Sequence, residues 1–116
     1  MLIGSDSLLI ECGDIWRARG HAIDAVVTDA PRVASWARGV GAQVIDADGD
    51  YASALSARKF DYLFAITFLR ILPARVLGMP GRAAINFHDG PLPRYAGLNA
   101  PTWALINRER EYGITW

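Results

Sequence analysis

The sequence has few of the features that mark secreted, membrane-spanning or nucleic-acid-binding proteins. Its single cysteine, Cys12, can form neither an internal disulfide bond nor a zinc site by itself. Uninterrupted apolar runs are only a few residues long, far below the roughly 20 that a membrane-spanning helix needs. Twelve basic residues balance twelve acidic ones, so no charge field indicates nucleic acid or an anionic membrane as a partner. Because no signal peptide is visible either, we expect a cytoplasmic protein.

The motifs of nucleotide binding are also missing. Residues 4–9 contain one glycine where the dinucleotide fingerprint needs three, and the Asp6 carboxylate stands where the backbone would approach a pyrophosphate. Lys59 is the only lysine, and no Gly-Lys-Ser or Gly-Lys-Thr sequence occurs. NAD and ATP binding are therefore disfavoured. Ser5, Asp6 and Ser7 are expected to cap the first helix instead.

The sequence does contain enough apolar residues for one packed core. It has 116 residues, of which 52% are hydrophobic. Short apolar runs predict strands at 1–4, 23–28, 43–45, 62–66, 83–87 and 113–116. Amphipathic segments predict helices at 7–19, 31–40, 50–58, 73–77 and 99–107. This alternation predicts an α/β fold: a Rossmann-like, doubly wound, mostly parallel sheet flanked by helices, in a single domain over residues 1–116.

Several side chains have predicted structural roles in the helices. The first helix places Leu8, Cys12, Ile15 and Trp16 on one face, which we expect to pack in the core. Asp29 is expected to cap the second helix and Asn99 the last one. The alternating charges of residues 108–111 predict a solvated helix end.

Asn86 and His88 stand out at the end of the fifth predicted strand. Alternation along the strand puts both side chains on one face. An imidazole exchanges protons near neutral pH, and an amide N–H stabilises an oxyanion, so the pair could act on one reacting atom. The alternative is that both side chains only satisfy the backbone of the following loop. That loop, residues 88–98, contains two glycines and two prolines, and such a rigid loop beside a polar pair favours a site.

Two motifs resemble those of the folate-dependent formyltransferases. Asn86-Phe87-His88, followed by Pro91-Leu92-Pro93-Arg94-Tyr95 and Gly97, resembles the signature of that family. Its members include methionyl-tRNA, glycinamide ribonucleotide and sugar-nucleotide formyltransferases. Residues 87–100 look most like the formylation domains of nonribosomal peptide synthetases. Residues 68–73 resemble the segment whose backbone cradles the folate pteridine, and residues 4–9 and 113–116 also fit the family.

The resemblance implies formyl transfer from 10-formyltetrahydrofolate to a primary amine, without a metal. Asn86 would hold the formyl oxygen and stabilise the oxyanion. His88 would act in the same oxyanion-binding site and help to move the proton. The folate would lie against Phe68, Arg70, Ile71 and Leu72, mainly through backbone hydrogen bonds. For Ile71 and Leu72, core packing is the simpler reading, and it does not exclude the folate role.

The acceptor would enter past residues of the loop that follows His88. The resemblance places Pro93, Arg94, Tyr95 and Gly97 there. Arg94 and Tyr95 could equally be ordinary surface residues of this loop. The acceptor itself stays open between an aminoacyl group tethered to a carrier protein, a sugar nucleotide and an aminoacyl-tRNA.

The sequence departs from the family pattern in two ways. Asp89, Gly90 and Pro91 stand where the family usually has a serine-leucine pair. The family also completes its site with an aspartate for which this sequence has no match. If the strand continues through Asp89, we expect its side chain to point away from His88. We therefore expect the N-terminal part of a catalytic domain from a larger chain, with weak or no activity alone. The rival interpretation is a non-catalytic α/β docking or structural module that retains this fold.

Overall fold

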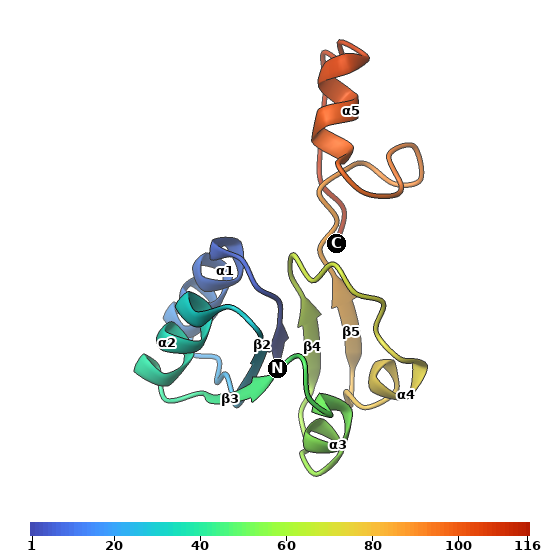
Figure 1. Cartoon of the computed structure of the whole chain (residues 1–116). Coiled ribbons are helices and arrows are strands. Elements are labelled where there is room, and N and C mark those ends of the chain that lie inside the picture. Colours follow the sequence, from blue (N-terminus) through green and yellow to red (C-terminus); the bar gives the residue numbers. More distant parts are fainter. The chain divides into compact units, whose positions relative to one another are not determined.

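The computed structural model describes all residues, Met1–Trp116, as alternating strands and helices (Figure 1). The strands are β1 (Leu2–Ile3), β2 (Ala25–Thr28), β3 (Gln43–Asp46), β4 (Tyr62–Ala65) and β5 (Ala83–Asn86). The helices are α1 (Ser7–Ala18), α2 (Pro31–Gly39), α3 (Tyr51–Ser56), α4 (Ala74–Leu77) and α5 (Ala100–Ile106). No helix combines the length and the apolar character that crossing a membrane requires.

The strands form one sheet in the order β3-β2-β1-β4-β5. Strand β1 is central and pairs in parallel with both β2 and β4, with Leu2 opposite Val26 and Phe64. Strand β2 pairs in parallel with β3. Strands β2 and β3 are thus added on one side of β1, and β4 and β5 are added on its other side. This topology confirms the predicted doubly wound fold.

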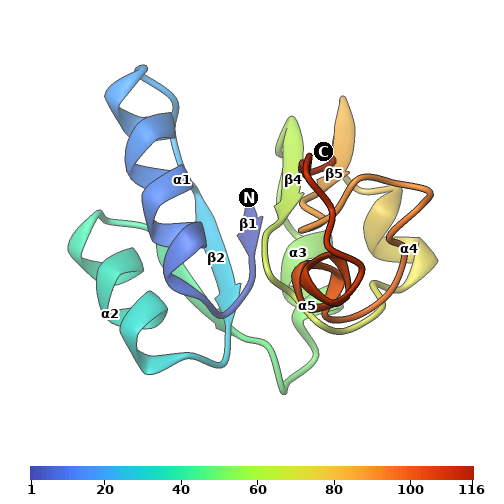
Figure 2. The same cartoon turned by 90° about the horizontal axis from the view of Figure 1, so that it is seen from above.

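Helices cover both faces of this sheet, as parallel strands require. Helices α1 and α2 lie on one side of the strands, and α3 and α4 lie on the other (Figure 2). On the α3 and α4 side, Leu55 and Val76 pack in one buried cluster with Ile3, Val27 and Leu63 of the sheet. The fold therefore rests on a core that spans the central strands.

The chain divides into two compact units, Met1–Ile85 and Asn86–Trp116. The first unit holds α1 to α4 and the sheet except for Asn86, the last residue of β5. The second unit holds α5 and has a small buried cluster of its own, formed by Tyr95, Ala100 and Ala104. The assignment of residues 1–116 to one catalytic domain stays a prediction.

The buried face of α1 differs from the predicted one. Its buried residues are Leu9 and Gly13, whereas Ile15 is 52% exposed. The reason is close packing against α2: a Cβ atom on Gly13 would lie 2.2 Å from Cη2 of Trp36. Trp16 does pack as predicted, with its ring centroid 4.6 Å from that of Phe64.

The predicted caps hold for one helix of three. The Asp6 carboxylate accepts a hydrogen bond from the Ser7 N–H and caps α1 as expected. Asp29 does not cap α2, because the N-cap residue is Ala30 and the Asp29 carboxylate binds other partners. Asn99 occupies the N-cap position of α5, but at a φ of 59° its side chain makes no capping hydrogen bond.

The predicted strand at 113–116 is wrong. Only Thr115 of this segment pairs with another strand-like residue, in a single antiparallel bridge to His88. Alternating apolar residues predicted a strand here, but this pattern does not show how many residues pair with a neighbouring strand.

Candidate functional site

The backbone after β5 is fixed by hydrogen bonds to Thr115. The His88 N–H donates to the Thr115 carbonyl at 2.8 Å, and the Thr115 N–H donates back to the His88 carbonyl at 3.0 Å. The Thr115 hydroxyl donates to the Gly90 carbonyl at 2.8 Å and accepts from the Leu92 N–H at 3.1 Å. Four hydrogen bonds to one residue therefore hold the loop at 88–92 in place.

The imidazole of His88 is held in one orientation. Its Nε2 lies 2.6 Å from the Tyr95 carbonyl oxygen, and its side chain is 17% exposed. Because a carbonyl can only accept, Nε2 carries the proton, and Nδ1 is the basic nitrogen of the neutral ring. His88 thus does satisfy loop backbone, which was the simpler alternative, but its Nδ1 makes no hydrogen bond within the chain.

The strand does not continue through Asp89, so the condition for its side chain to point away from His88 is not met. Its Oδ1 lies 3.8 Å from Nδ1 of His88 rather than pointing away. Alternation no longer applies, because β5 ends at Asn86 and the backbone turns after it. Asn86 itself is exposed at the end of β5.

Arg94 and Tyr95 belong to a polar cluster inside the second unit. The Tyr95 hydroxyl donates to Oε1 of Glu109 at 2.7 Å and accepts from Nδ2 of Asn107 at 3.1 Å. The Arg94 guanidinium also binds Glu109 and lies over the Tyr95 ring, 5.5 Å from its centroid. Arg108, Arg110 and Glu111 are exposed, as predicted for a solvated helix end, whereas the side chain of Glu109 is only 16% exposed. Alternating charge signs gave no indication of a tyrosine partner 14 residues away.

The loop after Tyr95 borders a small hollow. The hollow has a volume of about 250 Å³ and is lined by Arg94, Tyr95, Leu98 and Trp103, among others. Gly97 has a φ of 113°, a backbone conformation that favours glycine, and the Leu92–Pro93 peptide bond is cis. The placement of Pro93, Arg94, Tyr95 and Gly97 beside an acceptor stays a prediction.

In the first unit, the segment at residues 68–72 follows β4 as an exposed loop. Phe68 and Leu72 pack against the core cluster, whereas Leu69 and Ile71 are 83% and 97% exposed. Core packing therefore describes Leu72 but not Ile71. None of the peptide groups of residues 68–72 is hydrogen-bonded to another backbone group. The loop consequently presents N–H and C=O groups that are not paired within the backbone. Each of them can form a hydrogen bond with a ligand.

The side chain of Arg70 binds residues that follow β2 and β3. Its Nη2 donates to Oδ2 of Asp29 at 2.8 Å and to Oδ1 of Asp48 at 2.7 Å. Its Nη1 donates to the carbonyl oxygen of Ala47 at 2.9 Å. The Ser5 hydroxyl also donates to Asp29. Sequence reasoning missed these partners, although Ser5, Asp29 and Asp48 each follow a predicted strand closely.

The electrostatics of this network are visible in two pKa shifts. The hydrogen bond from Ser5, together with the Arg70 charge, holds the pKa of Asp29 below its ordinary value. The hydrogen bond to Asp48, with the charges of both carboxylates, raises the pKa of Arg70. Both groups are therefore charged throughout the neutral range.

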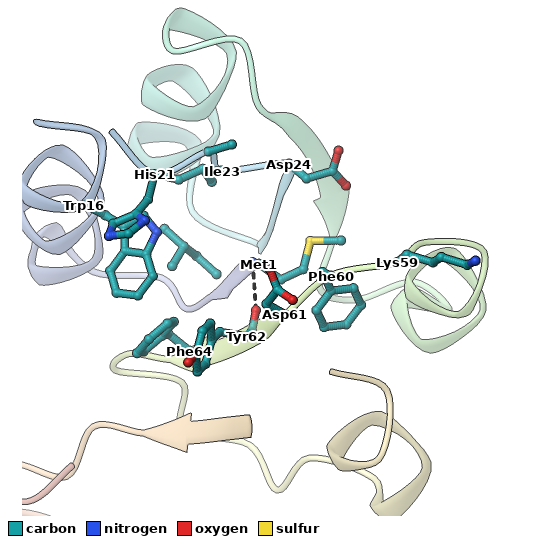
Figure 3. Close-up of a pocket in the computed structure, with 12 residues that line it drawn as sticks. Met1, Trp16, His21, Ile23, Asp24, Lys59, Phe60, Asp61, Tyr62 and Phe64 are labelled. Atoms are coloured by element: carbon teal, nitrogen blue, oxygen red, sulfur yellow. Dashed lines mark hydrogen bonds between the residues drawn. The ribbon is translucent and has the colours of Figure 1, made fainter. Parts of the chain in front are cut away.

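A larger pocket lies at the opposite edge of the sheet (Figure 3). It has a volume of about 480 Å³, and its lining includes Met1, Asp24 and Asp61, which precede or begin strands. The Met1 amino group donates to the Tyr62 carbonyl at 3.0 Å, and burial lowers its pKa. Residues 68–72 and the loops that hold Asp29 and Asp48 follow the carboxyl ends of strands β4, β2 and β3. This pocket is therefore separate from the candidate donor site.

No three His, Cys, Asp or Glu side chains come together in an arrangement that could hold a metal ion.

Comparison with known proteins shows where the chain belongs. The model of the formyl transferase family matches residues 17–116. Methionyl-tRNA formyltransferase of Anaeromyxobacter dehalogenans is 33% identical over 129 aligned positions, which cover 97% of this chain and 41% of that protein. The same enzyme of Synechococcus elongatus is 33% identical over 98 positions, which cover 84% and 30%. The chain thus spans less than half the length of these relatives.

Solved structures share the fold. Glycinamide ribonucleotide transformylase 1 of Geobacillus kaustophilus superposes with a TM-score of 0.81 at 18% identity, covering 97% of this chain and 69% of that one. Its counterpart from Symbiobacterium toebii gives a TM-score of 0.82 at 20% identity, covering 97% and 61%. At these identities the likeness concerns the fold alone. The family match over residues 17–116 shows that this chain belongs to the formyl transferase family.

Proposed function

We propose that this chain takes part in formyl transfer from 10-formyltetrahydrofolate to a primary amine, in the cytoplasm. The observation that carries the proposal is His88 in the family motif, with Nε2 fixed by the Tyr95 carbonyl and Nδ1 left basic. A fixed imidazole with one free nitrogen suits proton transfer at neutral pH. Family membership supplies the reaction class.

The first unit would bind the donor. The unpaired peptide groups of residues 68–72 support this role, because a pteridine offers several hydrogen-bond donors and acceptors along one edge. Phe68, Arg70, Ile71 and Leu72 would line the site, as the resemblance implies. The exposed position of Ile71 leaves the backbone on that side of the loop accessible.

The second unit would supply the groups that assist the transfer. The amine nitrogen forms a bond to the formyl carbon, and the bond from that carbon to N10 of the folate breaks. One proton leaves the amine and one arrives at N10, so the exchange balances. The Asn86 amide would donate a hydrogen bond to the formyl oxygen as charge develops on it, and Nδ1 of His88 would carry the proton.

The acceptor that we propose is an aminoacyl group tethered to a carrier protein. The support is the resemblance of residues 87–100 to the formylation domains of nonribosomal peptide synthetases. The relatives named above are methionyl-tRNA formyltransferases. Aminoacyl-tRNA and amino-sugar nucleotides are therefore the acceptors against which a carrier-bound group must be compared.

A transfer assay with the complete protein tests the proposal. Labelled 10-formyltetrahydrofolate is supplied with each of the three acceptors, and the labelled product is measured. Asn86→Ala and His88→Ala should each lower kcat by about 10²-fold or more, since each removes a group that stabilises the transition state. His21→Ala, which changes the other histidine, should leave kcat unchanged. Near-normal turnover in both site variants would refute the assignment of these residues.

The non-catalytic module is the second candidate. The hydrogen bond between His88 and the Tyr95 carbonyl fits it equally well, because such a bond also serves a purely structural histidine. If the wild-type protein transfers no formyl group and binds no folate, while His88→Ala lowers the melting temperature, this candidate replaces the enzyme.

A further inference from the structure

We propose that Arg70 is a positioning residue for the donor site. Its guanidinium joins the loop at 68–72 to the loops after β2 and β3. These contacts hold the unpaired peptide groups of residues 68–72 in the arrangement that receives the folate ring. This inference rests on the proposed function. It assigns the Arg70 side chain to the protein rather than to the ligand.

The geometry of the guanidinium supports this role. Its three hydrogen bonds to Asp29, Asp48 and the Ala47 carbonyl lie between 2.7 and 2.9 Å. Bonds between charged groups at such distances are among the strong ones in proteins. The planar fork of arginine can reach acceptors on two loops at once, which an ammonium group does less well.

The loop has few other anchors. Phe68 and Leu72 hold its two ends on the core cluster, and the Arg70 guanidinium lies 5.8 Å from the Phe68 ring centroid. Leu69 and Ile71 extend into solvent, and the backbone makes no internal hydrogen bonds. Arg70 is therefore the polar anchor at the middle of the loop.

The charges around Arg70 mean that its removal would disturb the contacts between these loops. The guanidinium lies between two carboxylates, Asp29 and Asp48, and Ser5 adds a hydrogen bond to Asp29. Without the cation, the Asp29 and Asp48 carboxylates would lose their shared partner, and the three loops would lose the hydrogen bonds that join them here. Three of the five N–H donors of the guanidinium are used in this way.

The test compares Arg70→Ala, Arg70→Lys and Asp48→Asn in the complete protein. The control is Arg75→Ala, which removes an arginine from α4 that pairs with Asp50 at 3.5 Å. Calorimetry measures the Kd for 5-formyltetrahydrofolate, and hydrogen exchange without ligand measures the amides of residues 68–72. Steady-state assays give KM for the folate and kcat separately.

We expect Arg70→Ala to raise Kd and KM on the order of tenfold, as the loss of a charge-assisted hydrogen bond would. The amides at 68–72 should exchange faster, and kcat at saturating folate should change little. Arg70→Lys and Asp48→Asn should shift in the same direction by less, and both keep the fold testable if Arg70→Ala does not fold. Arg75→Ala should match the wild type.

Two results would overturn the inference. Unchanged Kd and exchange in Arg70→Ala would show that the loop needs no such anchor. Weaker binding with unchanged exchange would show that Arg70 contacts the folate directly. A wild-type protein that binds no folate would instead overturn the proposed function, whatever the exchange rates of the variants.

Discussion

At the scale of single residues, hydrogen-bond partners decide what each key side chain can do. The Tyr95 carbonyl takes the Nε2 proton of His88, which leaves Nδ1 as the basic nitrogen. The Asp29 and Asp48 carboxylates take the donors of Arg70, which leaves the backbone of its loop as the exposed surface. The partner of His88 lies seven residues on in the same loop, whereas Asp29 and Asp48 lie in other loops than Arg70, so the role of Arg70 depends on how those loops fold together.

Asp29 offers a test of the Arg70 network by pH. Removing its Ser5 partner in Ser5→Ala should raise the pKa of Asp29 toward its ordinary value, because that hydrogen bond is the main cause of the lowered pKa. A carbon-13 titration of the aspartate carboxyls measures the midpoint. Ser56→Ala, whose hydroxyl binds the Ser53 carbonyl, is the control and should leave the midpoint in place. An Asp29 midpoint that does not move in Ser5→Ala would contradict the network.

The same shift predicts how stability depends on pH. A carboxyl whose pKa is lower in the folded state contributes stability above its unfolded value of about 3.9. That contribution is lost as the pH falls through the folded pKa. The wild-type protein should therefore lose more stability than Ser5→Ala in this acid range.

Residue patterns predicted local partners better than distant ones. The Asp6 cap could be predicted because the carboxylate and the Ser7 N–H that it binds are neighbours in sequence. The pairing of Arg70 with Asp29 spans 41 residues, and that of Tyr95 with Glu109 spans 14. No local pattern encodes such pairs, because they form only when separate loops meet at a strand end or beside a helix.

At the scale of elements, the turn from β1 into α1 depends on Gly4. Its N–H donates to the Val27 carbonyl at 3.0 Å, between the central strands. A Cβ atom at Gly4 would lie 1.8 Å from the carbonyl oxygen of Ile66, which is backbone and has little room to move. The close approach of these two chain segments therefore requires glycine.

Gly4→Ala should destabilise the protein by about 1–3 kcal/mol through this overpacking. Denaturant unfolding of the variant and the wild type measures the difference in free energy of unfolding. Gly39→Ala in α2 is the matched control, because no atom lies within 4 Å of its added Cβ. The control should be neutral or slightly more stable, since alanine favours helix. Equal stability of Gly4→Ala and the wild type would refute the close packing.

The elements themselves could largely be predicted from periodicity. The five helices and the first five strands form where apolar spacing predicted them, most with ends shifted by one or two residues. The errors are in packing: the buried face of α1 is set by Gly13 against Trp36, and a helical wheel does not show a partner helix. At 113–116 the pattern could not show that only Thr115 would pair.

At the scale of the whole molecule, the two compact units carry different parts of the proposed reaction. The first presents the free backbone of residues 68–72, and the second presents Asn86 and the fixed imidazole of His88. The family match includes both segments.

The most direct measurement is a titration of 5-formyltetrahydrofolate into the nitrogen-15-labelled complete protein. The account predicts saturable shifts of the backbone amides of residues 68–72, together with a change at the ring nitrogens of His88. The amides around Met1 and Trp16, at the opposite pocket, should stay in place. The absence of shifts at 68–72 with millimolar ligand would contradict the account.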